Sequence, residues 1–102
     1  FNLNIPLPEK LDAEAYRKAL GAALARVREF APTFLIVSLG LDTARADPTG
    51  TWELVAKDFE RNGAAIGALH LPTLVVQEGG YGVRVLGRNA ASFFVGLHRA
   101  AM

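Results

Sequence analysis

The chain has no cysteine, no long apolar run and almost no net charge. Without cysteine it can form neither a disulfide framework nor a thiolate metal site, which favours a reducing cytoplasm as its compartment. No apolar stretch approaches the roughly 18 residues that span a bilayer, so no membrane partner is expected. The formal net charge is +1 and the basic residues form no patch, which argues against nucleic acid as a partner.

Apolar side chains are abundant in the chain. It contains 102 residues, of which 51% are hydrophobic. A domain of this size buries proportionally less surface than a large one, so this much apolar material indicates a piece that packs against more protein. Phe1 accordingly reads as an internal residue of a longer polypeptide, and the first residues show no signal-peptide pattern.

Apolar periodicity divides the chain into a short first strand and then helices that alternate with strands. Residues 1–8 alternate apolar and polar side chains and contain two prolines, which is typical of an edge strand. The three expected helices run from the N-cap Asp12 to the stop at Pro32, from about 52–55 to about 69, and from about 83 to about 100. Tyr16 belongs to the apolar face of the first helix. Gly63 and Gly67 weaken the second and predict its close packing on a sheet.

Two further runs have strand length and are apolar almost throughout, residues 34–39 and 72–77. Continuous rather than alternating hydrophobicity predicts burial on both faces, as in a parallel sheet. Together with the helices between and around them, these runs predict an α/β fold with right-handed crossovers.

Each of these apolar runs leads into a loop with polar residues. In open α/β sheets ligands bind beyond the carboxyl ends of the strands, so Asp42 and Tyr81 are expected at the same edge of one sheet. Asp42 can equally cap a turn, and Tyr81 can be a core tyrosine with a satisfied hydroxyl. Asp47 precedes Pro48 and is interpreted as a turn-former.

The two loops together resemble a known family. The sequences SLGLDTARADP (residues 38–48) and EGGY (78–81), in this order and after such strands, are similar to the C-terminal part of the histone deacetylase superfamily. The segments NIPLP (4–8) and LPTLVVQ (71–77) add to the likeness, which covers essentially the whole chain. It is greatest to bacterial acetylpolyamine amidohydrolases and related class II-like deacetylases. The resemblance implies a parallel-sheet, three-layer arginase/deacetylase-like α/β fold, present as a C-terminal fragment.

The resemblance also implies roles for five residues. Asp42 matches the family's second zinc-binding aspartate, and Tyr81 matches the tyrosine that hydrogen-bonds the acetyl carbonyl and then the oxyanion. Gly79 and Gly80 match glycines of the pocket wall under that tyrosine. Thr49 falls where the family has a residue that lines the substrate tunnel. The implied cofactor is Zn²⁺, which in catalytic sites takes three protein ligands and an open position for water.

The chain departs from the family in its metal ligands. It contains neither the Asp-x-His pair nor the tandem histidines that the family has upstream. Residues 1–102 are therefore interpreted as the C-terminal segment of a single deacetylase catalytic domain, inactive alone. The expected partners are the missing N-terminal part, an acetylated amine substrate such as an acetylpolyamine or acetyl-lysine, and further copies of the chain in a homo-oligomer.

Two other interpretations belong to different classes of protein. The same scaffold can serve as a non-catalytic α/β module for oligomer assembly. A flavodoxin-like or receiver-like domain is disfavoured, because the chain shows no phosphate-binding loop and no strand-end acidic cluster with its lysine.

Overall fold

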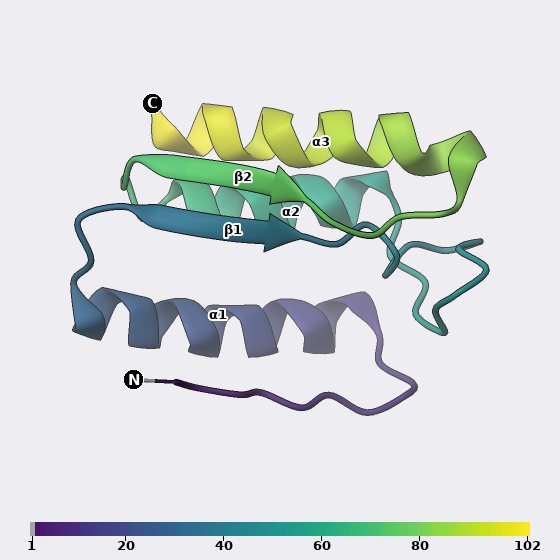
Figure 1. Ribbon diagram of the computed structural model, residues 1–102, viewed down its shortest axis with the longest axis horizontal. Coiled ribbons are helices and arrows are strands. Elements are labelled where there is room, and N and C mark those ends of the chain that lie inside the picture. Colours follow the sequence, from purple (N-terminus) through teal and green to yellow (C-terminus); the bar gives the residue numbers. More distant parts are fainter. Residues whose placement is uncertain (1) are drawn as a thin grey trace.

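The computed structural model describes residues 2–102, so Phe1, part of the expected first strand, lies outside the described residues. In chain order it shows helix α1 (Ala13–Phe30), strand β1 (Leu35–Leu39), helix α2 (Ala56–Gly67), strand β2 (Thr73–Gln77) and helix α3 (Val83–Ala101) (Figure 1). The order expected for these five elements is confirmed, with ends that shift by a few residues. Within residues 2–102, no helix is long and apolar enough to cross a membrane.

The first described residues do not form the expected edge strand. Residues 2–8 are neither strand nor helix, and the two prolines among them have no N–H to give to a ladder. The loop after β1 instead donates hydrogen bonds to the carbonyl oxygens of residues 8 and 9. Trp52 Nε1 donates to the Pro8 carbonyl oxygen at 3.1 Å. The Thr51 hydroxyl donates to the carbonyl oxygen of Glu9.

Local signals set the two ends of α1 where the sequence predicts them. Asp12 Oδ1 accepts a hydrogen bond from the Ala15 N–H at 2.8 Å and caps the first turn. At the other end Ala31 is left-handed, with φ 54°, and its N–H donates to the Val27 carbonyl oxygen. Pro32 follows at once and cannot continue the helix.

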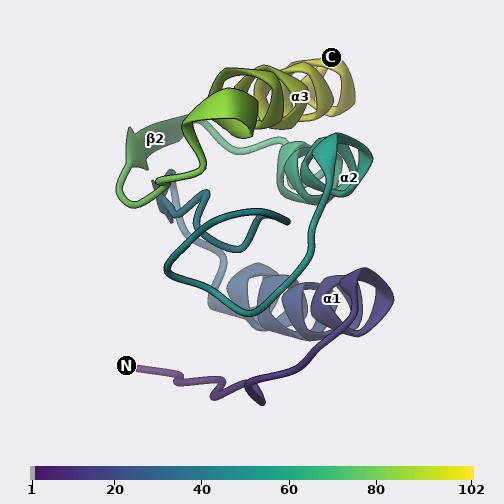
Figure 2. The same ribbon diagram turned by 90° about the vertical axis from the view of Figure 1, so that its right-hand side faces the viewer.

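The two strands pair in parallel, as expected, with Leu35 opposite Thr73 and Leu39 opposite Gln77. Side chains on one face of this sheet, Val37 among them, pack into the core. Figure 2 shows all three helices on that same side of the sheet.

The opposite face of the sheet is bare, which corrects the expectation of burial on both faces. Phe34, Ile36, Leu74 and Val76 are 61%, 58%, 59% and 43% exposed. No helix within residues 2–102 lies over them (Figures 1 and 2). The apolar pattern is that of strands buried on two sides, but the chain supplies a cover for one side only.

The core lies between the sheet and the pair formed by α2 and α3. Phe59 of α2 and Phe93 of α3 are almost fully buried. They belong to one apolar cluster with Leu39 of β1 and with Leu41 and Leu54 of the loop that follows it. The same cluster therefore fixes the helix pair and the loop that carries Asp42.

Glycines let α2 and α3 approach each other closely. A Cβ on Gly63 would overlap the Phe93 carbonyl oxygen, and one on Gly67 would overlap that of Leu97. Gly96 of α3 faces the α2 backbone in the same way. The close packing predicted from these glycines is thus between two helices rather than between helix and sheet, because the partner on the glycine face of α2 is α3.

Replacing Gly63 with alanine is expected to destabilise the protein by about 1–3 kcal/mol, because the new methyl group overlaps backbone that cannot move without shifting α3. Gly21→Ala is the matched control, since a Cβ there meets nothing within 4 Å and alanine raises helix propensity by up to about 1 kcal/mol. Denaturant unfolding measures both changes. A Gly63→Ala protein as stable as Gly21→Ala would contradict the close helix pairing.

Candidate active site

The loops after β1 and β2 run side by side at the carboxyl edge of the sheet. Their backbone pairing continues past the strands. The Glu78 N–H donates to the Leu39 carbonyl oxygen at 2.8 Å, and the Leu41 N–H donates to that of Gly79 at 2.7 Å. This pairing fixes the spacing of the two loops, so the residues that follow in each loop are neighbours across the edge.

Asp42 and Tyr81 meet across Gly79. A Cβ built on Gly79 would lie 2.6 Å from Asp42 Oδ2 and 3.5 Å from Tyr81 Cε2. A side chain here would displace the carboxylate, so glycine is what allows the carboxylate and the ring to flank one point. The expected juxtaposition is therefore found, with Asp42 half-buried and Tyr81 exposed. A carboxylate oxygen can hold a cation and a phenol can donate to a developing oxyanion.

Asp42 and Thr49 line one cavity of about 270 Å³ beside this edge. Its other lining residues are Glu9, Thr43, Gly50, Thr51 and Trp52. The cavity thus brings Thr49 to the same wall as Asp42, while Tyr81 approaches Asp42 from the other loop, over Gly79.

Gly80 faces the core rather than Asp42. Its φ is +150°, a backbone conformation that L side chains rarely adopt. A Cβ there would lie 2.7 Å from Leu86 Cδ1 and 3.0 Å from Leu41 Cβ. The turn that leads into Tyr81 therefore requires glycine at this position for both its conformation and its space.

Asp47, interpreted from the sequence as a turn-former, also joins the two loops. It is 6% exposed, and its Oδ1 accepts from the Thr49 N–H at 2.8 Å and from the Thr49 hydroxyl at 2.6 Å. Its Oδ2 accepts from the Tyr81 N–H at 2.8 Å. The Thr49 hydroxyl, followed by the N–H groups of Tyr81, Thr49 and Gly82, holds the pKa of Asp47 below its usual range against the opposing effect of burial.

Tyr16 of α1 lies near enough to Asp42 to be affected by its charge. Burial raises the pKa of the Tyr16 phenol, and the negative charge of Asp42 raises it further. The Tyr16 ring packs edge-to-face on Trp52, with 5.5 Å between the ring centroids, and Trp52 lines the Asp42 cavity. Helical spacing predicted Tyr16 only as part of an apolar face, because spacing does not reveal which loop that face meets.

The metal implied by the resemblance finds one candidate ligand at this edge, Asp42. Among residues 2–102, no three His, Cys, Asp or Glu side chains gather closely enough to hold a metal ion, whereas a catalytic zinc takes three protein ligands. His70 precedes β2 and His98 lies in the last turn of α3, both at the opposite end of the strands (Figure 1). Residues 2–102 therefore do not complete a zinc site by themselves.

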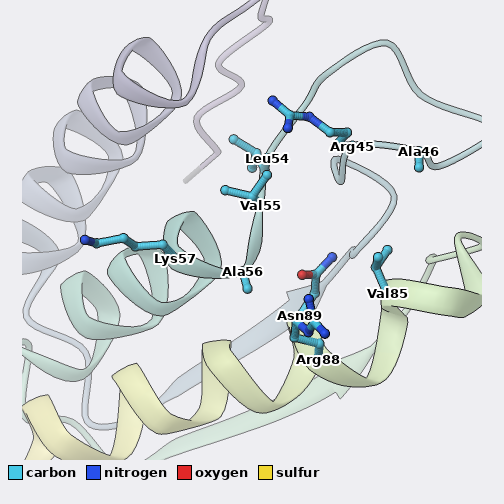
Figure 3. Close-up of a pocket in the computed structure, with 9 residues that line it drawn as sticks. All are labelled: Arg45, Ala46, Leu54, Val55, Ala56, Lys57, Val85, Arg88 and Asn89. Atoms are coloured by element: carbon cyan, nitrogen blue, oxygen red, sulfur yellow. The ribbon is translucent and has the colours of Figure 1, made fainter.

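A second cavity, of about 300 Å³, opens between the loop after β1 and the starts of α2 and α3 (Figure 3). Arg45, Val55 and Asn89 are among the residues that line it. In Figure 3 the Lys57 side chain extends away from the other labelled residues. None of the five residues that the resemblance assigns to a site lines this second cavity. The second cavity is therefore distinct from the edge where Asp42 and Tyr81 meet.

Comparison with known proteins assigns the chain a family and relatives. The family model of the histone deacetylase domain matches residues 1–97. The chain is 44% identical over 96 residues to acetylpolyamine amidohydrolase of Burkholderia pseudomallei, and 43% identical over 102 residues to acetylpolyamine amidohydrolase 2 of Pseudomonas aeruginosa. These matches cover 94% and 97% of this chain but 28% and 30% of the two relatives.

The fold is similar to a solved structure as well. The crystal structure of acetylpolyamine aminohydrolase from Burkholderia pseudomallei superposes with a TM-score of 0.93 at 42% identity, over 97% of this chain and 29% of that one. The expected α/β deacetylase-like fold is confirmed, and residues 2–102 contain two parallel strands of it with helices on one side of them. The chain spans less than a third of the length of each of these three proteins.

Because Asp47 gains these hydrogen bonds in its ionised form, its contribution to folding depends on pH. Its lowered pKa means that this contribution is complete above the ordinary Asp pKa of about 4 and is lost as the pH falls through the lowered value. We expect the difference in unfolding free energy between wild type and Asp47→Asn to be constant from about pH 7 to about pH 5 and to narrow below about pH 4. Denaturant titrations across this range measure it. A difference that stays constant or grows in acid contradicts the assignment.

Proposed function

The chain belongs to the histone deacetylase domain family, and on this premise we propose that residues 1–102 are the C-terminal segment of one catalytic domain. That domain is a zinc-dependent deacetylase that hydrolyses acetylated amines, and the segment is inactive without the upstream part. This chain and its upstream part together are called the complete domain below.

One observation carries the proposal: the Asp42 carboxylate and the Tyr81 ring flank the same point over Gly79. Amide hydrolysis needs a charged group that holds a metal and a donor aimed at the oxygen that becomes negative. In this assignment Asp42 is a metal ligand, and Tyr81 donates its phenol hydrogen to the acetyl carbonyl and to the oxyanion. One such donor is typically worth about 3–4 kcal/mol of transition-state stabilisation.

When bound, Zn²⁺ lowers the pKa of its water ligand and polarises the amide carbonyl. Because no three ligands gather within residues 2–102, the proposal requires the upstream part to supply the other ligands and a histidine base for the water proton. Thr49, on the same cavity wall as Asp42, contacts the substrate. Gly79 keeps the wall beneath Tyr81 free of a side chain, and Gly80 allows the turn that leads into Tyr81.

The bare face of the sheet supports the need for an upstream part. Phe34, Ile36, Leu74 and Val76 present apolar surface that nothing in residues 2–102 covers. Burial is worth about 25 cal/mol per Å² of apolar surface. The matched relatives are more than three times as long as this chain, so a single longer polypeptide has the material to cover this face.

The proposed substrate class is an acetylated polyamine, with acetyl-lysine as the wider alternative. Both bacterial relatives carry acetylpolyamine in their names, and their identity to this chain extends over nearly all of it. The absence of cysteine favours the cytoplasm as the compartment in this proposal.

In the complete domain, Asp42→Ala is expected to abolish activity by losing the metal, while Tyr81→Phe keeps the metal and loses turnover. The two side chains have different tasks, since one holds a cation and the other donates to an oxyanion. Metal content and kcat on an acetylated amine, measured on both variants, distinguish these effects. A Tyr81→Phe enzyme with the kcat of wild type would refute the role of Tyr81.

The isolated 102-residue chain is expected to be associated or aggregated rather than a stable monomer, because its sheet face and strand edges are uncovered. Sedimentation velocity at low micromolar concentration tests this, with the complete domain as the control. A monodisperse monomer that unfolds cooperatively would count against the fragment interpretation. Discrete oligomers formed by a natural chain of this length would favour the alternative of a non-catalytic assembly module.

A further inference from the structure

Asp47 occupies an unusual place between the two loops of the candidate site. It is nearly fully buried, and both of its carboxylate oxygens accept hydrogen bonds. Oδ1 is held within its own loop by Thr49, while Oδ2 reaches the Tyr81 N–H, 34 residues further along the chain. Among the side-chain hydrogen bonds of residues 2–102, those that Asp47 accepts from the Tyr81 and Gly82 N–H groups join the loop after β1 to the loop after β2.

The backbone before Tyr81 needs such an anchor. Pairing with the first loop holds the second loop as far as Gly79, whose carbonyl oxygen accepts from Leu41. Gly80 then departs from extended geometry with φ +150°. Helix α3 begins at Val83, two residues after Tyr81. Tyr81 therefore lies between a glycine turn and a helix start, and the bond from its N–H to Asp47 fixes the peptide from which its ring projects.

The Tyr81 ring has little packing to hold it in place by itself. It is 55% exposed, and its ring edge lies over Gly79, where there is no side chain to pack against. Its direction toward Asp42 therefore depends on its backbone. A hydrogen bond to an ionised carboxylate is about twice as strong as a neutral one, which suits Asp47 to this task.

We propose that Asp47 is a positioning residue that aims the Tyr81 phenol at the reacting carbonyl through its hydrogen bond to the Tyr81 backbone. The inference rests on the proposed function, in which Tyr81 donates to the oxyanion. A transition-state donor acts only if it is held in position beforehand, and a displacement of about 1 Å at a reacting centre costs on the order of 100-fold in rate. Asp47 thus acts on kcat through Tyr81, without touching substrate or metal.

The test is a double-mutant cycle in the complete domain, with kcat, KM and metal content measured on an acetylated amine. Asp47→Asn is expected to lower kcat by about 10- to 100-fold and to leave metal content unchanged. Because Asp47 also accepts hydrogen bonds from Thr49, a change in KM reports that contact, and the criterion for positioning Tyr81 is kcat. In a Tyr81→Phe background the same substitution is expected to cost nothing further. Asp42→Ala is expected to lose the metal, so its rate is the background with which the residual rate of Tyr81→Phe is compared.

Asp12→Asn is the matched control. Asp12 also accepts a backbone N–H, that of Ala15 at 2.8 Å, but it does so at the exposed start of α1. Its substitution is expected to leave kcat unchanged. If Asp47→Asn does not fold, Asp47→Glu keeps the carboxylate but moves its oxygens relative to the Tyr81 N–H, and the criterion remains whether its loss of kcat disappears in the Tyr81→Phe background.

Hydrogen–deuterium exchange separates this inference from the proposed function. Asp47→Asn is expected to speed amide exchange in residues 78–82 and to leave β2 unchanged. If Asp47→Asn produces this pattern but the wild-type complete domain shows no deacetylation, the proposed function fails and the anchoring of the loop stands. If wild type is active and Asp47→Asn costs as much with Phe at position 81 as with tyrosine, or costs nothing in either, the positioning role is overturned.

Discussion

The parallel pairing of β1 with β2, prolonged into the loops beyond them, is the constraint on which the candidate site depends. Two backbone hydrogen bonds after the strands, at Glu78 and Leu41, keep the loops in register where side chains begin to matter for chemistry. The α2–α3 pair packs on the face of this sheet that carries Val37 and stabilises it. Because the loops diverge only after the last of these bonds, Asp42 and Tyr81 lie on either side of one glycine.

The edge of the sheet at which the site lies was predictable from sequence, because the rule needs only two apolar runs and the loops that follow them. Asp42 and Tyr81 each come a few residues after such a run, so parallel pairing is enough to bring them together. The helix ends at Asp12 and Pro32 were predictable for a similar reason, since caps and prolines act within a few residues. In each case the physical cause lies next to its effect in the chain.

Features that depend on a distant partner were not predictable in the same way. A turn motif explains the two hydrogen bonds that Asp47 accepts from Thr49, but its bond to Tyr81 depends on where a loop 34 residues away comes to lie. Gly63 indicates close packing without saying whether the neighbour is strand or helix. The first segment alternates like a strand, yet residues 2–8 form none, and the two prolines among them have no N–H to give to a ladder. Ile36 and Leu74 belong to runs with the pattern of strands covered on both faces, but both side chains are exposed in residues 2–102.

The hydrogen bonds from Thr51 and Trp52 attach the segment before α1 to the loop after β1. Thr51 and Trp52 also line the Asp42 cavity. Both donate their hydrogen bonds to main-chain carbonyl oxygens rather than to side chains. These hydrogen bonds therefore depend on the path of the main chain in this segment and not on the identity of its side chains. Residues of the chain before α1 thus help to position two lining residues of that cavity, Thr51 and Trp52.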